Sequence, residues 1–267
     1  MVMTLNPGTQ RLNTIPYMFG RIDEPFQEII RRFGLCACDS HQDALFVLEF
    51  DDQRLQLRSL HDKGLGTFAV EFAAGKAAHR RIFGSYRNEA IVKAVGFKRG
   101  SIPAVLDLTA GFGRDAFVLA SAGCRVHLLE RCNLAAALLD DALRRAGQDV
   151  HIGAWIHERL TLSRDDALKR TRPLPFVPDV VYIDAMFPQK QGSALARKEI
   201  RLLQMIAGTD NDQDRLLEEA CHLARRRVVV KRPNFAHYLN QEKPRFSIES
   251  RHYRFDVYII SPDNEKG

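Results

Sequence analysis

The amino-acid sequence predicts an α/β protein, in which a doubly wound, mostly parallel β-sheet follows a small N-terminal α+β domain. Strand and helix patterns alternate from residue 104 to residue 260, which is typical of a sheet with helices on both faces. Gly111 and Gly113 follow the first of these strands, as a tight turn into a helix requires. The 267 residues suffice for one large and one small domain, which we expect at residues 76–267 and 1–75.

The N-terminal domain is predicted from a short helix and several short strands. We expect the helix, two hairpin strands and a further strand at residues 25–33, 44–50, 54–60 and 68–72. Leu55 and Leu57 alternate with polar residues, which is typical of a half-buried hairpin strand. A helical segment over 73–95, interrupted near Gly84, leads into the second domain.

The second domain is predicted to have parallel strands at residues 104–108, 125–129, 160–163, 179–183 and 227–230. We expect the intervening helices at residues 115–122, 133–146, 193–206 and 212–225. An antiparallel pair at 246–250 and 255–260 ends the sheet. Because ligands bind beyond the carboxyl ends of the strands in such sheets, the chemistry is expected just after each strand.

Composition excludes several classes of protein. Hydrophobic residues make up 45% and charged residues 27%, which is typical of a globular chain, and no apolar run is long enough for a membrane helix. No secretory signal pattern is visible at the start, and five cysteines without a paired framework fit a reducing compartment, so we expect a cytoplasmic protein. Cys36 and Cys38 lack the second pair that a zinc site needs, so no metal is expected.

The turn after the first strand predicts a nucleoside cofactor. Gly111, Gly113 and Ala116 fit the G-x-G-x-x-G/A pattern of nucleotide-binding sheets, although a plain glycine turn would have the same residues. Glu130 ends the next strand, where an acid hydrogen-bonds the two ribose hydroxyls.

Charge distinguishes between the possible cofactors. Asp107 and Asp115 flank the glycine turn and would repel a pyrophosphate, and Arg114 offsets at most one of them. S-adenosylmethionine has no phosphate, carries an ammonium and a sulfonium, and offers Arg114 a carboxylate. The charges therefore favour S-adenosylmethionine over a nicotinamide dinucleotide, and a dehydrogenase is the remote alternative.

The ends of the third and fourth strands carry further candidates. Asp166, before Ala167, is expected to accept a hydrogen bond from the adenine amino group or to cap a helix. Asp184-Ala185-Met186-Phe187-Pro188 resembles the [DNS]-P-P-[FYW] motif of amino-group methyltransferases, with Ala185 in place of a proline. Asp184 and the Ala185 carbonyl would accept the two N–H bonds of an exocyclic amine, and Phe187 would stack on the extruded base.

A basic surface suggests a polyanionic partner. The net charge is +6, and lysines and arginines occur in clusters, although most such clusters are simply solvated. Our candidates for phosphate contacts are His79, Arg80, Arg81, Lys190, Lys231 and Arg232.

Taken together, these motifs resemble the RsmJ-type 16S ribosomal RNA (guanine-N2) methyltransferases of bacteria. The resemblance covers residues 64–260 and is carried by the segments 78–84, 89–96, 107–120, 129–131, 180–188, 227–233 and 254–258. It implies a Rossmann-like class I methyltransferase sheet and assigns cofactor binding to Arg114, Asp115, Glu130, Arg131, Asp166, Ala167 and Asp184.

The activity that the resemblance implies is methyl transfer from S-adenosylmethionine to the N2 amine of a guanine in 16S rRNA. The partner would be that RNA or the small ribosomal subunit, and the catalytic residues would be Asp184, Phe187 and Pro188. Two alternatives remain open. One is methylation of DNA or a protein amine, and the other is a non-catalytic cofactor-binding RNA module, for which Ala185 is the only support.

Overall fold

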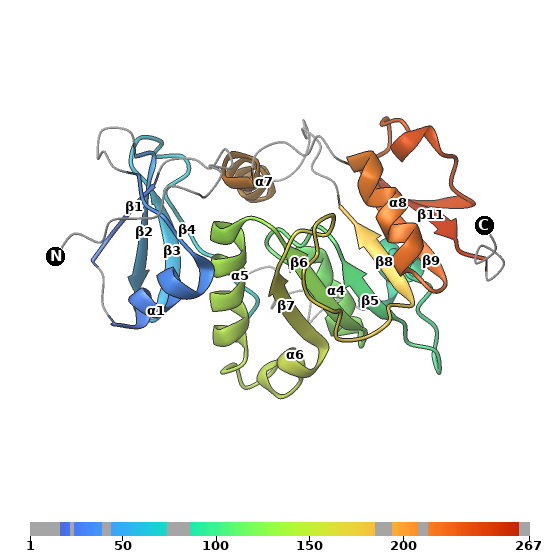
Figure 1. The fold of residues 1–267 in the computed structure, drawn as a ribbon, viewed down its shortest axis with the longest axis horizontal. Coiled ribbons are helices and arrows are strands. Elements are labelled where there is room, and N and C mark those ends of the chain that lie inside the picture. The colour runs from blue at the N-terminus through green and yellow to red at the C-terminus, as the bar shows by residue number, and fades with distance from the viewer. Residues whose placement is uncertain are drawn as a thin grey trace.

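The computed structural model describes residues 17–21, 24–38, 44–73, 86–184, 194–207 and 213–261. Within these ranges the strands form two sheets (Figure 1). The smaller sheet has the order β1-β2-β3-β4, and the larger has the order β10-β11-β9-β8-β5-β6-β7. None of the helices in the described ranges is long and apolar enough to cross a membrane.

The small sheet confirms the predicted hairpin. It consists of β1 (Tyr17–Phe19), β2 (Phe46–Asp51), β3 (Arg54–Ser59) and β4 (Thr67–Phe68), with α1 (Glu24–Phe33) beside it. Asp52 and Gln53 form the hairpin turn with φ of 48° and 58°, as a two-residue turn of this kind requires. The predicted strand 68–72 is wrong in extent, because β4 pairs with β3 over two residues only. β1, which lies parallel to β2, was not predicted.

The large sheet follows the predicted alternation closely. Its strands are β5 (Ala104–Asp107), β6 (Arg125–Glu130), β7 (Leu160–Arg164), β8 (Val180–Ile183), β9 (Arg227–Pro233), β10 (Phe246–Glu249) and β11 (Tyr253–Ile259). Its helices are α3 (Ala90–Ala94), α4 (Arg114–Ala122), α5 (Asn133–Ala146), α6 (Gly153–Arg159), α7 (Ala194–Ala207) and α8 (Gln213–Leu223), with short 3₁₀ turns at Tyr86–Asn88 and Leu239–Gln241. Among these, α6 was not predicted.

The strand order places a topological switch point between β5 and β8. β5 pairs with β6 on one side and with β8 on the other, all in parallel. β11 alone runs antiparallel, inserted between β9 and β10, as expected for the terminal strand. The central strands are buried on both faces: Val180 and Tyr182 face one hydrophobic cluster, and Val181 and Ile183 face the other.

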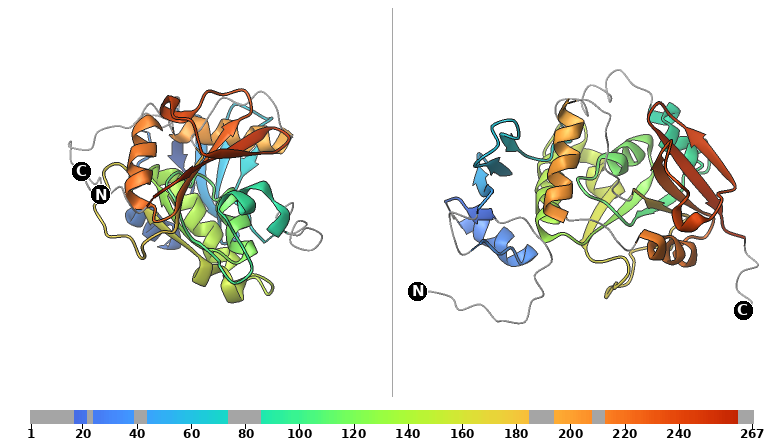
Figure 2. Two further views of the ribbon diagram at one scale, coloured as in Figure 1. Left: turned by 90° about the vertical axis from the view of Figure 1, so that its right-hand side faces the viewer. Right: turned by 90° about the horizontal axis from the view of Figure 1, so that it is seen from above.

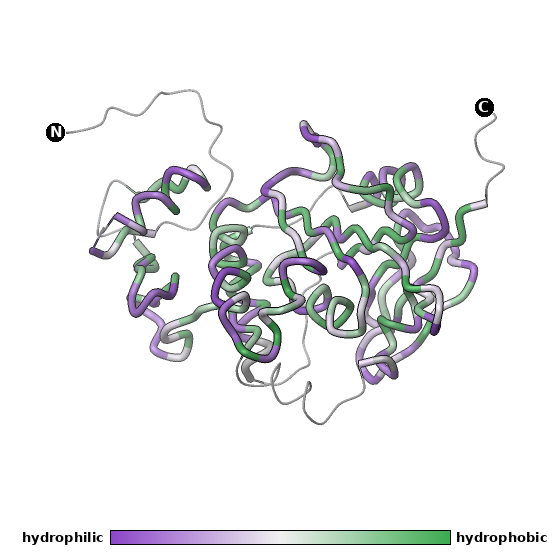
Figure 3. Tube along the Cα trace, turned by 90° about the horizontal axis from the view of Figure 1, so that it is seen from below, coloured by the Kyte–Doolittle hydropathy of each residue, from purple (hydrophilic) through white to green (hydrophobic). Residues whose placement is uncertain are grey.

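Helices cover both faces of the large sheet (Figure 2). α4 and α5 contribute to one buried cluster, and α8 contributes to the other through Leu216, Leu217 and Ala220. Along α5 the hydropathy alternates between hydrophobic and hydrophilic residues (Figure 3), as expected for a helix with one buried face.

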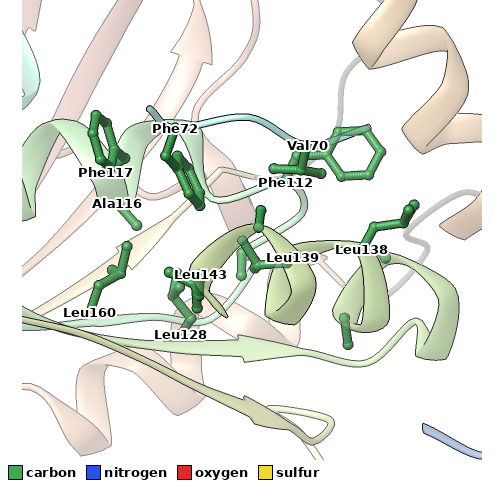
Figure 4. Close-up of a cluster of buried hydrophobic side chains, with 14 of the residues drawn as sticks. Val70, Phe72, Phe112, Ala116, Phe117, Leu128, Leu138, Leu139, Leu143 and Leu160 are labelled. Carbon is green, nitrogen blue, oxygen red and sulfur yellow. The ribbon is translucent and has the colours of Figure 1, made fainter. Parts of the chain in front are cut away.

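The small and large sheets share one hydrophobic cluster. The segment after β4 inserts Val70 and Phe72 against α4 and α5 (Figure 4). The Phe72 ring stacks on Phe117 of α4 with ring centroids 4.8 Å apart, and Phe68 lies 4.7 Å from Phe112. The expected boundary near residue 75 stays a prediction, but the two parts are packed together rather than joined by a free linker.

A buried ionic network reinforces this contact. Asp141 of α5 is 3% exposed, and its Oδ2 accepts hydrogen bonds from the Leu55 backbone N–H (3.1 Å) and from Arg145 Nε (2.9 Å). Arg145 also donates to Glu71 Oε2 (2.7 Å) and to the Val70 carbonyl (2.5 Å). One helix of the large domain thereby binds both β3 and the segment after β4.

We expect Asp141→Ala to lower the free energy of unfolding by about 3–5 kcal/mol, because it leaves Arg145 and the Leu55 N–H without their buried acceptor. The adjacent Asp140→Ala is the matched control: Asp140 pairs with Arg32, whose side chain is 59% exposed, and its loss should cost at most about 1 kcal/mol. Urea unfolding of both variants measures the difference. Equal destabilisation would show that the buried network does not join the two domains.

Candidate cofactor and active site

A cavity of about 810 Å³ lies at the carboxyl ends of the parallel strands, beside the switch point between β5 and β8. Its walls come from the strand ends, from the segment Thr67–Phe72 of the small domain, and from α7 through Lys198, Glu199 and Leu203. Figure 2 shows α7 standing between the small sheet and the rest of the large domain. The volume is typical of a small-molecule site.

Most of the predicted cofactor residues meet in this wall: Asp107, Gly111, Arg114, Asp115, Glu130, Arg131, Asp166, Ala167 and Asp184. Gly113 does not line the cavity. A Cβ at Gly113 would lie 2.9 Å from Leu139 and 3.3 Å from Phe72, so its role is to pack the turn against the core. Phe187, Pro188 and Lys190, as well as His79, Arg80 and Arg81, lie outside the described residues.

The glycine turn is held by Glu130 and covered by α7. Glu130 is 7% exposed and accepts hydrogen bonds from the Gly111 N–H (2.8 Å) and the Cys132 N–H (2.7 Å), one on each carboxylate oxygen. Gly111 has a φ of 53°, a conformation that favours glycine, and a Cβ there would lie 2.7 Å from the end of the Leu203 side chain. Because the Gly111 N–H is already bonded, the turn is poorly suited to cradle a pyrophosphate. The predicted contact of Glu130 with the two ribose hydroxyls stays a prediction.

Nine acidic side chains and four basic ones line the cavity, and Asp107, Asp115, Glu130 and Asp184 are among the acidic ones. Burial raises the pKa of Asp107 to about 8, and the charges of Asp115, Asp184 and Glu130 add to that rise. Asp107 is 2% exposed and accepts a hydrogen bond from the Thr109 N–H (2.9 Å). Such a cavity favours a cationic ligand, so the residues present fit the ammonium and sulfonium of S-adenosylmethionine.

Lys231 provides the balancing cation within this cluster. Its Nζ lies 2.7 Å from Asp115 Oδ2 and 2.9 Å from Asp184 Oδ2. Burial opposes the charged form of Lys231, but the two carboxylates outweigh burial and raise its pKa, so the side chain is an ammonium at neutral pH. The Tyr182 hydroxyl donates to Asp115 (2.6 Å), and the Asp184 N–H donates to Thr109 Oγ1 (2.7 Å).

Arg114 binds protein partners on both sides of the cavity. It donates to the carboxylate of Glu199 on α7 (2.7 and 3.2 Å) and to the Glu71 carbonyl (2.6 Å). A ligand carboxylate at Arg114 would therefore compete with Glu199. Neither Glu199 nor Glu71 was predicted as part of the site, because no local motif marks them.

Two expectations about individual residues need correction. Lys231 and Arg232 were expected to contact phosphates, but Lys231 points into the acidic cluster and Arg232 is 6% exposed, donating to the His237 carbonyl (2.6 Å). Asp166 caps a turn through the Leu168 N–H (2.9 Å) and not a helix. In the described part of the chain, no group of three or more His, Cys, Asp or Glu side chains is arranged to hold a metal ion.

The comparisons with known proteins agree with the charge argument. Residues 28–260 match the family described as "Putative SAM-dependent methyltransferase". The chain is 53% identical over 216 residues to the ribosomal RNA small subunit methyltransferase J of Tolumonas auensis, covering 81% of this chain and 87% of that protein. The same-named protein of Photobacterium profundum is 51% identical over 238 residues, with coverage of 87% and 91%.

This chain belongs to the methyltransferase J family of SAM-dependent methyltransferases. A crystal structure of a SAM-dependent methyltransferase from Neisseria gonorrhoeae matches it with a TM-score of 0.71 and 29% identity, covering 92% of this chain and 96% of that one. The predicted fold class, family and cofactor are confirmed, and the dehydrogenase alternative is wrong.

We expect the affinity for S-adenosylmethionine to rise between pH 7 and pH 9, because Asp107 must lose its proton to complement the cation and its pKa is about 8. The rise due to this group is at most about tenfold per pH unit below pH 8 and levels off above it. The Asp107→Asn variant should not show this rise in affinity.

Calorimetry in buffers of different ionisation enthalpy measures both the affinity and the protons released. Titration of the ligand's own amine affects both proteins equally, so it cancels in the comparison. The same pH dependence in Asp107→Asn and wild type would contradict the assignment.

Proposed function

We propose that this methyltransferase transfers the methyl group of S-adenosylmethionine to the exocyclic N2 amine of a guanine in 16S rRNA. The observation that carries the proposal is Asp184, which directly follows β8 in the wall of the cavity and is held by Lys231. The relatives that are 51–53% identical are named for the RNA of the small ribosomal subunit, which supports the RNA substrate. The guanine-N2 target is what the family resemblance implies, and the carboxylate of Asp184 suits an exocyclic amine.

Bound in the cavity, S-adenosylmethionine supplies an electrophilic methyl group on a sulfonium. The exocyclic amine of guanine is a poor nucleophile because its lone pair is delocalised into the ring. Asp184 is 37% exposed at the cavity, and a carboxylate has lone pairs beyond the one that Lys231 uses. By accepting an N–H of the amine, Asp184 orients the lone pair towards the methyl group.

The charge of Asp184 contributes further. As the methyl group moves from sulfur to nitrogen, positive charge develops on the amine, and a fixed carboxylate next to it stabilises that charge. The methylated amine is then strongly acidic, so one proton leaves it for Asp184 or for water. Burial raises the pKa of Asp184 while the Lys231 ammonium lowers it, and no strong base is needed for this step.

Lys231 and its partners act as positioning residues. The Lys231 ammonium links Asp184, which directly follows β8, with Asp115 of α4. The Tyr182 hydroxyl of β8 also donates to Asp115. Asp184 is therefore oriented before the substrate arrives, which lowers the cost of reaching the reactive geometry.

A labelled-methyl assay tests the proposal against its alternatives. Tritiated S-adenosylmethionine is offered with small ribosomal subunits, free 16S rRNA, DNA and total protein in separate reactions. We expect label in rRNA only, and N2-methylguanosine after nuclease digestion and mass spectrometry. Label in DNA or protein would show that the substrate is not rRNA. Cofactor binding without label in any of the four would indicate a non-catalytic module.

We expect Asp184→Asn to lower single-turnover methylation by about 100-fold or more, as for the loss of other preorganised polar groups. Binding of S-adenosylmethionine and RNA should change much less, because the interaction is strongest in the transition state. Asp52→Asn in the β2–β3 turn is the control, since Asn tolerates its φ of 48°. A folded Asp184→Asn enzyme that methylates at the wild-type rate would rule out the assigned role.

A further inference from the structure

A strongly exposed aromatic side chain lies on the loop that follows β9. Phe235 is 82% exposed and follows β9, four residues after Lys231. Pro233 pairs with Tyr253 of β11, and Tyr253 lines the cavity with its ring 5.0 Å from Lys231 Nζ. The loop that carries Phe235 thus begins at the rim of the cavity, next to the Lys231–Asp184 pair.

Two buried arginines, Arg254 and Arg232, fix the backbone of this loop by hydrogen bonds to its carbonyls. Arg254 donates to the carbonyls of Pro233 (3.0 Å), Asn234 (2.8 Å) and Ala236 (2.8 Å). Its Nε is paired with Asp256 (2.9 Å), which is fully buried. Arg232 donates to the next carbonyl along the chain, that of His237 (2.6 Å).

These hydrogen bonds fix the position of the backbone that carries Phe235. The carbonyls of Pro233, Asn234, Ala236 and His237 accept hydrogen bonds from the two arginines, so the loop backbone cannot fold inward without breaking charge-assisted hydrogen bonds. Exposure of an apolar ring to water is unfavourable. An exposed ring on a rigid loop is therefore typical of a binding site for a partner molecule.

The surroundings favour a nucleotide base as the partner. Asn234 and His237, which lie near Phe235 in the loop, are polar and exposed. Tyr238 is 37% exposed, and its ring lies 5.0 Å from the Arg254 guanidinium, so Phe235 is not part of a broad apolar patch. Asn234 Nδ2 donates to the Ser250 carbonyl (3.2 Å). This hydrogen bond joins the loop to the turn that carries the exposed Arg251. An aromatic face with a cation nearby suits an unpaired base and its phosphate.

We propose that Phe235 is a stacking platform for an unpaired base that flanks the target nucleotide in the RNA substrate. The inference rests on the proposed function. When a guanine is taken out of its stack to reach Asp184, its neighbours lose a stacking face, and the Phe235 ring supplies one.

A single-tryptophan reporter tests the contact directly. Trp155 is the only tryptophan in the chain, so Trp155→Phe combined with Phe235→Trp leaves one indole at the proposed platform. We expect its fluorescence to be quenched when a 16S rRNA fragment containing the target binds. Trp155→Phe with Val150→Trp is the control, because Val150 is 89% exposed between α5 and α6, at the edge of the sheet where β7 begins. Its signal should not change.

Binding measurements complete the test. Phe235→Ala should weaken binding of the same RNA fragment by about 5- to 100-fold, whereas Phe235→Tyr keeps most of the affinity. The affinity for S-adenosylmethionine should stay at the wild-type value in both, and Val150→Ala should alter neither affinity.

Unchanged RNA affinity and an unquenched indole at position 235 would overturn the inference. A defect of Phe235→Ala seen with assembled subunits and absent with free RNA would also overturn it, since it would indicate contact with a ribosomal protein. If the wild type itself neither binds nor methylates rRNA, the proposed function fails first, before any variant is compared.

Discussion

The active site depends on one buried cation among carboxylates. Asp107, Glu130 and Asp184 lie at the ends of β5, β6 and β8, and Asp115 lies in the first turn of α4. Lys231 holds Asp115 and Asp184 at hydrogen-bond distance. Removing the partner of a buried charge is strongly destabilising, so β8, β9 and α4 keep their relative places as long as the Lys231 pair persists. The charge that remains is negative, and this is why the site suits a sulfonium donor better than a pyrophosphate.

The small domain completes the cavity and does more than flank it. Thr67–Phe72 forms one wall, and the Phe72–Phe117 stack and the Asp141–Arg145 network fix that wall on α4 and α5. Arg114 then joins the wall to α7 through Glu71 and Glu199. The glycine turn is consequently enclosed by residues from three distant parts of the chain, which a sheet with its helices alone would leave open.

Much of the fold could be predicted from the sequence because its elements are set by local patterns. The apolar strand at residues 104–108 and the helix at 133–146 each carry their own period and stop signals, and both were found nearly to the residue. The prediction of a strand at residues 68–72 failed because the apolar side chains of Val70 and Phe72 pack against α4 and α5. They do not mark a segment that pairs in a sheet. The partners of Arg114 and Lys231 had no local signal, since Glu199 and Asp115 lie 85 and 116 residues away in the chain.

The alternation of a β-strand explains why Lys231 and Arg232 differ so much although they are adjacent. Successive side chains of β9 point to opposite faces, so Lys231 enters the acidic cluster beside Tyr253 and Phe255. Arg232 points the other way, where its ladder partner Arg254 and the buried Asp256 lie, and supports the loop that follows the strand. Lys231 and Arg232, which the sequence predicted to be a phosphate-binding pair, therefore have two separate roles. Lys231 orients Asp184, the carboxylate that we propose meets the target amine, and Arg232 fixes the loop that carries Phe235.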